Sequence, residues 1–391
     1  MQSMEHALST VTDRIRAAVA DNTGLRIRGG GSKDFYTRTV QGEVLDTRGL
    51  HGVLSYEPSE LVVTVGAGTP LLELEALLAE KGQCLPFEPP HFEWSQADGV
   101  SRATVGGMVA AGLAGPARAN VGGVRDYVLG LKLINGRAEH LTFGGQVMKN
   151  VAGYDVSRLM VGAMGTLGLI TEVSLKVLPV APAEATLVFP VEQAAALEQL
   201  HRWGGEPLPL NASCWVHDDS GAASTAQDLL FVRLRGAVAA VEAATKRMLA
   251  DLPGSRMDNA QARPDWSLCR SQTLPFFKRP SDTTLALWRL SLPQTAPALA
   301  LPHAQPYAQL IEWHGALRWL WAPHEAAQQL QEVAHNVGGS ATVFIAADAH
   351  STGAGGQFGA QDLAVAAVER RLKASFDPHG IFNPGLPPHA N

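Results

Sequence analysis

The chain has 391 residues, of which 46% are apolar, 17% are charged and 39 are glycine. A chain of this length exceeds most single hydrophobic cores, so two domains are expected. The net charge of −6, and the absence of a Lys/Arg cluster interleaved with aromatic residues, give no reason to expect a nucleic-acid partner.

Cysteine spacing and hydrophobic runs narrow the class of protein further. Cys84, Cys214 and Cys269 are far apart and form no Cys-x-x-Cys pair, so we expect neither a zinc ion nor an iron–sulfur cluster held by this chain. Isolated thiols are typical of a reducing cytosol. No run of eighteen apolar residues occurs, so no membrane span is expected, while attachment to the inner membrane through partners stays open.

The first 180 residues alternate short strands with glycine turns. The N-terminal stretch predicts an amphipathic helix over residues 6–20 rather than a signal peptide, which favours a cytoplasmic location. The pattern then predicts a strand in LRIRGGG, a strand at 44–47, and two strands joined by a Glu-Pro-Ser turn at 52–68. A helix capped by Thr69 should follow and end at Gly82. A hairpin that turns at Asn135-Gly136 and a strand at 171–177 complete the order.

The amino-acid composition changes after a proline-containing linker at 178–186. Glycine clustering drops and tryptophan becomes frequent. Strands and helices then alternate, which fits a small sheet with helices on one face. A strand at 341–348 and a helix from about Gln361 complete the order, and no internal repeat is apparent in the sequence.

Glycine-rich stretches raise the question of whether the chain binds a large anionic ligand. Gly29, Gly30 and Gly31 stand in a row, although each glycine costs about 0.5–1 kcal/mol of backbone entropy. Residues 99–125 contain no Asp or Glu, and their small residues would let a large planar ligand approach the backbone; a plain turn and tight helix packing are the structural alternatives. These small residues are Gly106, Gly107, Ala110, Ala111 and Gly112. A further stretch, GAMGTLGLIT, favours an anionic ligand held by backbone N–H groups.

Two common nucleotide-binding motifs do not fit. After Gly66 and Gly68, Leu71 replaces the third glycine of a dinucleotide fingerprint, and no second parallel strand with an acidic end follows. Lys33 comes after Ser32, so the Gly-Lys-Ser/Thr order of a phosphate loop is absent.

Three blocks in a fixed order carry a family resemblance: RIRGGGSKDF, the stretch from SYEPSE to PFEPP, and the stretch from ATVGG to SLKVLP. Over about residues 20–180 they resemble the PCMH-type FAD-binding domain of the vanillyl-alcohol-oxidase superfamily. Within it the chain is most similar to the E-subunit family of bacterial glycolate oxidases. LWRLSLP, ALRWLWAP and FDPHGIFNPG extend this likeness nearly end to end.

The resemblance implies an α+β fold with two domains. A two-lobed FAD-binding domain is expected at 1–182, with lobes at about 1–52 and 53–182. A smaller ferredoxin-like α+β cap is expected at 183–340, and residues 341–391 should return to the FAD domain. FAD would lie between the two lobes with its ring facing the cap.

The resemblance also implies roles for single residues. Gly29, Gly30, Gly31 and Ser32 would give backbone and hydroxyl groups to the FAD pyrophosphate, and Lys33 would add charge. The residues expected along the flavin and the diphosphate are Thr104, Val105, Gly106, Gly107, Ala110 and Gly112. Those expected near the adenosine and ribityl groups are Gly165, Gly168, Leu169 and Ile170.

Two departures from the family pattern refine this expectation. Some relatives attach the flavin covalently through a His in the first glycine loop, whereas Ser32-Lys33 stands here, so noncovalent FAD is predicted. Relatives often read G-S-E-G-T-L-G in the third block, whereas this chain has Ala163 and Met164 between Gly162 and Gly165. No carboxylate is therefore available at that point.

No catalytic residue can be assigned. Flavin dehydrogenases of D-2-hydroxy acids hold the substrate carboxylate with Arg and remove the hydroxyl proton with His. The G-E-H-G-x-G-type signature of the catalytic sister subunit is missing, and His350 in the closest stretch has no Glu before it. His201, His314 and His350 are therefore more consistent with surface or structural roles. Arg289 is either a carboxylate ligand or a paired structural arginine. The cap tryptophans either mark a partner surface or belong to the core: Trp313, Trp319 and Trp321.

The resemblance thus implies a FAD-binding subunit of a multisubunit glycolate oxidase, which converts glycolate, a 2-hydroxy acid, to glyoxylate. A sister FAD-containing subunit would oxidise the substrate, and an iron–sulfur subunit would carry the electrons away. Two alternatives stay open: a self-sufficient FAD-dependent 2-hydroxy-acid dehydrogenase, and a redox-inactive assembly subunit. A molybdenum-hydroxylase FAD subunit shares the fold but is disfavoured by the whole-chain likeness.

Overall fold

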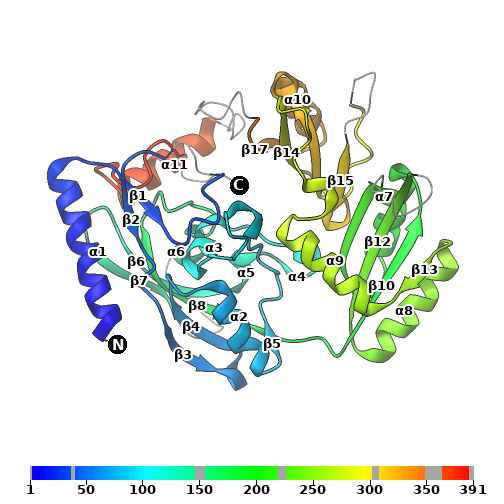
Figure 1. The fold of residues 1–391 in the computed structure, drawn as a ribbon, viewed down its shortest axis with the longest axis horizontal. Coiled ribbons are helices and arrows are strands. Elements are labelled where there is room, and N and C mark those ends of the chain that lie inside the picture. The colour runs from blue at the N-terminus through cyan, green and yellow to red at the C-terminus, as the bar shows by residue number, and fades with distance from the viewer. Residues whose placement is uncertain are drawn as a thin grey trace. The chain divides into compact units, whose positions relative to one another are not determined.

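The computed structural model describes residues 2–36, 40–145, 155–218, 226–301, 308–347 and 363–386. Its contacts divide the chain into two compact units, each discontinuous in sequence (Figure 1). The first unit contains the described parts of Met1–Ala114, Gly123–Val180 and Ala360–Asn391. The second contains those of Gly115–Gly122 and Ala181–Gly359. The chain therefore enters the second unit twice, the first time for only a few residues.

The first unit contains helices of four to twenty residues and three small sheets. The largest sheet has five antiparallel strands in the order β3-β4-β8-β6-β7, while β1 and β2 pair in parallel and β5 pairs with β9. The helices are α1 (Gln2–Asp21), α2 (Leu71–Glu80), α3 (Val105–Ala111), α5 (Val124–Tyr127), α6 (Val156–Leu159) and α11 (Leu363–Phe376). The strands are β1 (Leu25–Arg28), β2 (Glu43–Asp46), β3 (Val53–Glu57), β4 (Val62–Gly66), β5 (Gln83–Cys84), β6 (Val128–Ile134), β7 (His140–Gly144), β8 (Leu169–Lys176) and β9 (Leu178–Pro179).

One hydrophobic core fixes β1, the strand that leads into the glycine run. Helix α1 buries Val11, Ile15 and Ala18, which share one face because they are spaced by four and three residues. The same core contains residues of β1, of β2, of the segment after β2, of the five-stranded sheet and of the C-terminal tail: Leu25, Leu45, Leu50, Ile134, Leu169, Ile381 and Phe382. Residues from both ends of the sequence therefore support β1.

The predicted cap of α2 is wrong. Pro70, not Thr69, is the residue that precedes the helix. The Thr69 hydroxyl instead accepts a hydrogen bond from the Gly52 N–H at 3.0 Å, and its carbonyl accepts one from Val105 N–H at 3.0 Å. Thr69 thus ties α2 to neighbouring segments rather than capping it.

The second unit is built on one sheet of eight strands in the order β13-β10-β12-β11-β15-β16-β14-β17, antiparallel throughout. Its helices are α4 (Arg118–Val121), α7 (Gln193–Gly204), α8 (Val238–Asp251), α9 (Asn259–Ser271) and α10 (Ala327–Asn336). Its strands are β10 (Ala183–Pro190), β11 (Leu210–Asp218), β12 (Gln227–Gly236), β13 (Ser255–Met257), β14 (Leu285–Ser291), β15 (Gln309–Glu312), β16 (Leu317–Pro323) and β17 (Ser340–Ile345).

This sheet contains a structural repeat that the sequence does not reveal. Strands β10, β11, β12 and β13 with α7 and α8 follow the order β-α-β-β-α-β of a ferredoxin-like unit. Strands β14, β15, β16 and β17 repeat the same spatial order, with α10 before the last strand. The halves join where β11 pairs with β15. The first half therefore has the ferredoxin-like order, while the second shares its strand order without a described helix between β14 and β15. Strand β17 belongs to the second unit rather than to a returning tail.

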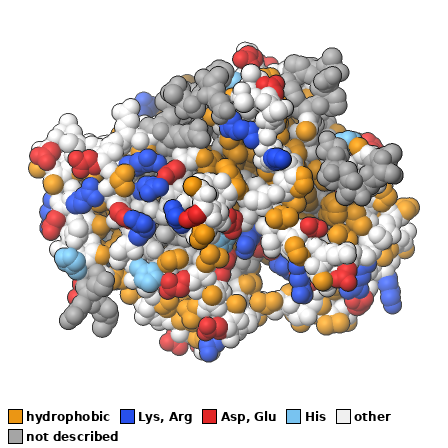
Figure 2. Space-filling view, viewed as in Figure 1, with side chains coloured by type: hydrophobic (Ala, Val, Ile, Leu, Met, Phe, Trp, Pro, Cys, Tyr) orange, Lys and Arg blue, Asp and Glu red, His pale blue; other side chains and the backbone are white. Residues whose placement is uncertain are grey.

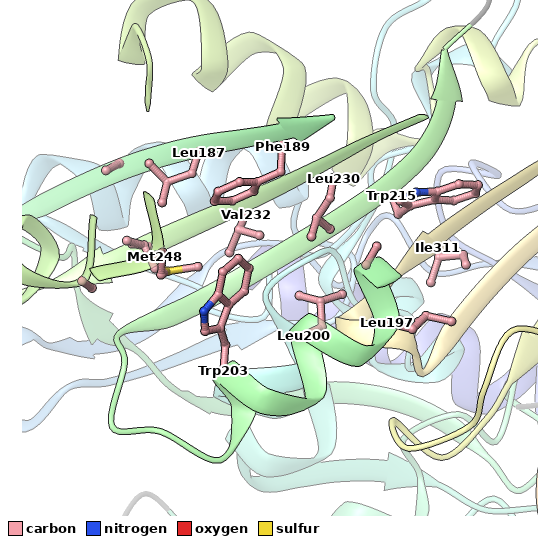
Figure 3. Close-up of a cluster of buried hydrophobic side chains, with 14 of the residues drawn as sticks. Leu187, Phe189, Leu197, Leu200, Trp203, Trp215, Leu230, Val232, Met248 and Ile311 are labelled. Atoms are coloured by element: carbon pink, nitrogen blue, oxygen red, sulfur yellow. The ribbon is translucent and has the colours of Figure 1, made fainter. Parts of the chain in front are cut away.

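Helices cover both faces of the first half, whereas one face was predicted. Figure 3 shows Leu197, Leu200 and Trp203 of α7 directed at strand residues such as Phe189 and Val232. Residues of α8 pack on the same cluster. Helix α9 lies against the other face, because its Trp266 donates to the hydroxyl of Thr186, whose side chain points away from that of its neighbour Leu187.

Candidate functional site

A hollow in the first unit begins where β1 ends. Its volume is about 90 Å³, well below the roughly 300–1,000 Å³ of pockets that enclose a whole small ligand. It therefore has room for one polar end of a large ligand. Its lining residues are Arg26, Ile27, Arg28, Gly29, Gly30, Gly31, Ser32, Lys33, Asp34, Val40, Thr104, Gly107, Ala110, Ala111, Met164 and Asn383.

The triple glycine is explained partly by protein packing. A Cβ atom on Gly30 would lie 1.5 Å from the carbonyl oxygen of Arg102, so this position admits no side chain. Gly31 has a φ of +76°, in the left-handed region that side chains disfavour. The first glycine loop therefore lies directly on the segment that leads into α3, which brings two of the predicted blocks together.

The same loop presents free hydrogen-bond donors. Among the residues that the structure describes, the backbone N–H groups of Gly29, Gly30, Gly31 and Ser32 make no hydrogen bond. Buried or half-buried N–H groups without an acceptor are rare in folded proteins. A row of them beside a hollow fits an anionic ligand with several oxygen atoms.

Charged side chains make the hollow cationic. Arg28 donates to Asp34 through Nε at 2.9 Å and Nη2 at 2.7 Å, and Arg26 contacts the other Asp34 oxygen at 3.0 Å. Lys33 is half-buried, and desolvation by the surrounding protein lowers its pKa to about 8. Three cations and one carboxylate therefore line the hollow, and Lys33 keeps most of its charge at neutral pH. Elsewhere on the face drawn in Figure 2, acidic and basic side chains are intermixed.

The second predicted block contributes through Thr104 and α3. The Thr104 hydroxyl accepts a hydrogen bond from the Gly107 N–H at 3.2 Å and so caps α3. Gly106 faces away from the hollow, where a Cβ atom would lie 2.7 Å from that of Ala67. Tight packing therefore explains Gly106, while Thr104, Gly107 and Ala110 line the hollow.

The other predicted cofactor residues do not line this hollow. They are Val105, Gly106, Gly112, Gly165, Gly168, Leu169 and Ile170. Val105 and Leu169 are fully buried. Gly165 lies next to Asn383, since a Cβ atom on it would be 2.9 Å from the Asn383 amide nitrogen. Roles for these residues toward a cofactor remain predictions.

Several lining residues were not predicted. Arg26 and Arg28 are alternate residues of β1, so they share one side of the strand, and this spacing is a signal that the sequence offered. Asn383 comes from the FNPG tail, 356 residues after Ile27. No local pattern links it to the first glycine loop.

The candidate catalytic residues of the second unit lie in structural settings. His201 hydrogen-bonds the carbonyl of Gln294, and His350 lies outside the described residues. His314 is buried, with Nε2 2.5 Å from the Asn120 amide, and burial lowers its pKa to about 4. Arg289 lies 5.7 Å from the Trp313 ring centre.

The tryptophans form part of the core of the second unit. Trp313, Trp319 and Trp321 are at most 4% exposed, so the partner-surface alternative is wrong. Trp313 donates to the carbonyl of Gly115 at 2.9 Å, and Arg118 lies 4.5 Å from its ring centre. The Trp313 side chain thus anchors the short segment 115–122 within the second unit.

Neither a metal site nor a membrane span is formed by the described part of the chain. Within the described ranges, no group of three His, Cys, Asp or Glu side chains is arranged to hold a metal ion. No described helix has the length and apolar character needed to cross a membrane.

Comparison with known proteins gives consistent results. Residues 7–144 match the FAD binding domain family. Glycolate oxidase subunit GlcE of Escherichia coli (strain K12) is 41% identical over 373 residues, which is 95% of each chain. Glycolate oxidase subunit GlcD of Bacillus subtilis (strain 168) is 32% identical over 161 residues, covering 41% of this chain and 33% of that protein.

A solved structure extends the comparison to the fold. An alkyldihydroxyacetonephosphate synthase superposes with a TM-score of 0.64 at 16% sequence identity, covering 96% of this chain and 75% of the other. At this identity the likeness shows the fold alone. It confirms the predicted α+β fold class.

Proposed function

Because this chain belongs to the family of glycolate oxidase subunit GlcE, we propose that it is the FAD-binding subunit of a multisubunit glycolate oxidase. The observation that supports this most directly is the cationic hollow with a row of N–H donors that no described group accepts. A diphosphate offers several anionic oxygens, which suits the charge and the N–H donors of that hollow. When bound, FAD would supply the electron acceptor for oxidation of a 2-hydroxy acid.

In this proposal the first glycine loop holds the diphosphate. The N–H groups of Gly29, Gly30, Gly31 and Ser32 donate to its oxygens, and Lys33 and the two arginines of β1 balance its charge. The second block runs along the flavin and diphosphate, through Thr104, Val105, Gly106, Gly107, Ala110 and Gly112. The third block lies near the adenosine and ribityl groups, through Gly165, Gly168, Leu169 and Ile170.

We expect the FAD to be bound noncovalently, because Ser32 and Lys33 stand where some relatives carry a flavin-linked histidine. Precipitating the protein with acid should leave the yellow colour in the supernatant. Colour that stays with the pellet would contradict this expectation.

We further propose that substrate oxidation occurs on a GlcD-type sister subunit and that an iron–sulfur subunit takes the electrons onward. Two observations support this division. His201 hydrogen-bonds the carbonyl of Gln294, and the buried His314 hydrogen-bonds the Asn120 amide, so both have contacts within the protein. The three cysteines include no Cys-x-x-Cys pair, the spacing typical of cluster ligands.

An anaerobic visible spectrum tests the proposal. The purified chain, reconstituted with FAD, should show an oxidised flavin that glycolate does not bleach until the sister subunits are added. Bleaching of the isolated chain by glycolate would instead establish a self-sufficient dehydrogenase. Failure to bind FAD, alone or in the complex, would leave the assembly subunit as the surviving alternative.

A further inference from the structure

The C-terminal FNPG segment completes the edge of β1. Leu25 donates to the carbonyl of Ile381 at 2.7 Å, and the N–H of Asn383 donates to the carbonyl of Leu25 at 2.8 Å. Leu25 and Phe382 form a parallel bridge. Residues 381–383 therefore act as a short strand beside β1, on the opposite edge from β2.

After residue 383 the side chain of Asn383, instead of the main chain, accepts the next hydrogen bond from β1. Its φ is +44°, so the backbone turns away from β1 after this residue. The next donor of β1, the N–H of Ile27, therefore bonds to the side-chain Oδ1 of Asn383 at 2.7 Å rather than to a main-chain carbonyl. Asparagine tolerates this left-handed conformation better than most residues.

The other end of the same amide reaches the third glycine-rich block. Its Nδ2 donates to the carbonyl of Met164 at 2.6 Å. Asn383 is only 6% exposed, yet it lines the hollow together with Ile27 and Met164. One amide group thus connects the strand before the first glycine loop to the turn that carries Met164.

A second network holds this tail segment in place. The buried carboxylate of Asp377 accepts from the N–H groups of Ile381 and Phe382 at 3.1 and 2.9 Å. Lys373 of α11 bridges the same carboxylate, at 2.6 Å, to the carbonyl of Thr166, also at 2.6 Å. Asn383 is therefore presented from a supported turn rather than from a loose terminus.

We propose that Asn383 is a positioning residue for the cofactor: its amide holds β1 and the Met164 turn at the separation that lets the first glycine loop bind a diphosphate. The inference rests on the proposed function only in naming FAD as the ligand. Without the amide, the Ile27 N–H and the Met164 carbonyl lose their partners, and the spacing of the walls is no longer fixed.

Asn383→Ala and Asn383→Asp test the proposal against Asn211→Ala. The alanine variant removes both bonds, whereas the aspartate keeps the acceptor for Ile27 and removes the donor to Met164. Asn211 is the matched control, since it is also a buried asparagine, 7% exposed, with one side-chain bond to Arg233 at 2.7 Å in the second unit. FAD affinity is measured by quenching of FAD fluorescence, and stability by urea unfolding of the apoprotein.

Both Asn383 variants should raise the dissociation constant of FAD at least tenfold, which equals about 1.4 kcal/mol. They should also raise that of ADP, which carries the diphosphate without the flavin. Asn211→Ala should lower stability and leave both constants within twofold of wild type. A folded Asn383→Ala variant that binds FAD within twofold of wild type would overturn the proposal. If the alanine variant does not fold, the aspartate variant is used instead, and FAD binding within twofold of wild type would again overturn the proposal.

Hydrogen exchange separates this proposal from the proposed function. If wild-type protein binds no FAD, the proposed function fails, and exchange in residues 25–33 of the apoprotein then decides on Asn383 alone. Faster exchange there in the Asn383 variants, but not in Asn211→Ala, supports the positioning role. Unchanged exchange contradicts it.

Discussion

Nε2 of His91 lies 3.0 Å from Oε2 of Glu75, and the imidazole is completely buried. Its Nδ1 lies 2.9 Å from the hydroxyl of Ser101, three residues before Thr104. His91 therefore links α2 to the segment that leads into α3. We expect His91→Leu to lower the free energy of unfolding by about 1–3 kcal/mol, because both polar partners lose a bond in a protein interior. Urea denaturation measures this change. The exposed His379 supplies the control, and an equal effect of His379→Leu would contradict the assignment.

Gly30 should be intolerant of any side chain. In Gly30→Ala the new Cβ would meet the Arg102 carbonyl at 1.5 Å, so the two loops must separate. We expect a loss of about 1–3 kcal/mol in stability, typical of overpacking, together with loss of bound FAD. Gly204→Ala is the control, since nothing lies within 4 Å of its added Cβ. A Gly30→Ala protein that retains wild-type stability and FAD content would show that the loop adapts.

Lys33 should make FAD affinity depend on pH. Its pKa of about 8 means that the ammonium is charged at pH 7 and neutral at pH 9.5, so affinity for an anionic diphosphate should fall several-fold between these values. Lys33→Met should bind FAD more weakly at pH 7 and show a flatter profile. Equilibrium dialysis with FAD at both pH values makes the comparison, and parallel profiles for the two proteins would exclude a role for Lys33.

The same lowered pKa of Lys33 should reduce the stability of the folded apoprotein at neutral pH. A lysine whose pKa is depressed by the fold destabilises the folded state wherever it is charged, below pH 8, and this effect disappears as the pH rises toward 10.5. Lys33→Met should therefore stabilise the apoprotein at pH 7 while weakening FAD binding. Urea unfolding of both apoproteins at pH 7 checks the sign, and a less stable methionine variant would contradict it.

His314 should make the protein sensitive to mild acid. Burial lowers its pKa to about 4, whereas the unfolded chain takes up this proton near pH 6.5. Stability is therefore fully present above pH 6.5 and falls as the pH drops toward 4, by up to about 3 kcal/mol. His314→Asn removes this titration and suits the local φ of +56°. Urea unfolding at pH 6.5 and pH 4 measures the loss of unfolding free energy, which should be smaller in the variant than in wild type. Equal losses in the two proteins would show that other groups cause the acid sensitivity.

The three thiols should react in two classes. Cys214 and Cys269 are buried, and the hydrogen bond between them, together with burial, raises the pKa of Cys269 well above its usual value. Cys84 is half-buried. Ellman's reagent should therefore modify one thiol in the native protein and three after unfolding. Rapid reaction of a second thiol in the native state would contradict the buried placement.

The sequence revealed those parts of the site whose chemistry is local. A run of glycines and an acid-free segment are unusual in themselves and favour a ligand site, but Gly30 and Thr104 were assigned to one site only through the family resemblance. Arg26 and Arg28 could have been included, because alternation along a strand places both on one side. Asn383 could not, since its importance depends on a partner hundreds of residues away.

The errors have equally physical causes. Thr69 is a good capping residue, but its hydroxyl is engaged by Gly52, a distant segment that sequence reasoning cannot place. ALRWLWAP has one charged residue among apolar ones, a pattern typical of a strand covered on both faces, and β16 is buried along nearly its whole length. The repeat in the second unit is a repeat of strand order, which dissimilar sequences can share.

The bond between Ile27 and Asn383 also bears on how the protein is made. A ribosome releases the chain from its N-terminus, so β1 emerges long before the segment that completes its edge. All the described strands of the second unit are synthesised in the interval. The second unit is therefore fully synthesised while the first still has an open strand edge, and the hollow beside β1 cannot be complete until translation has passed residue 383.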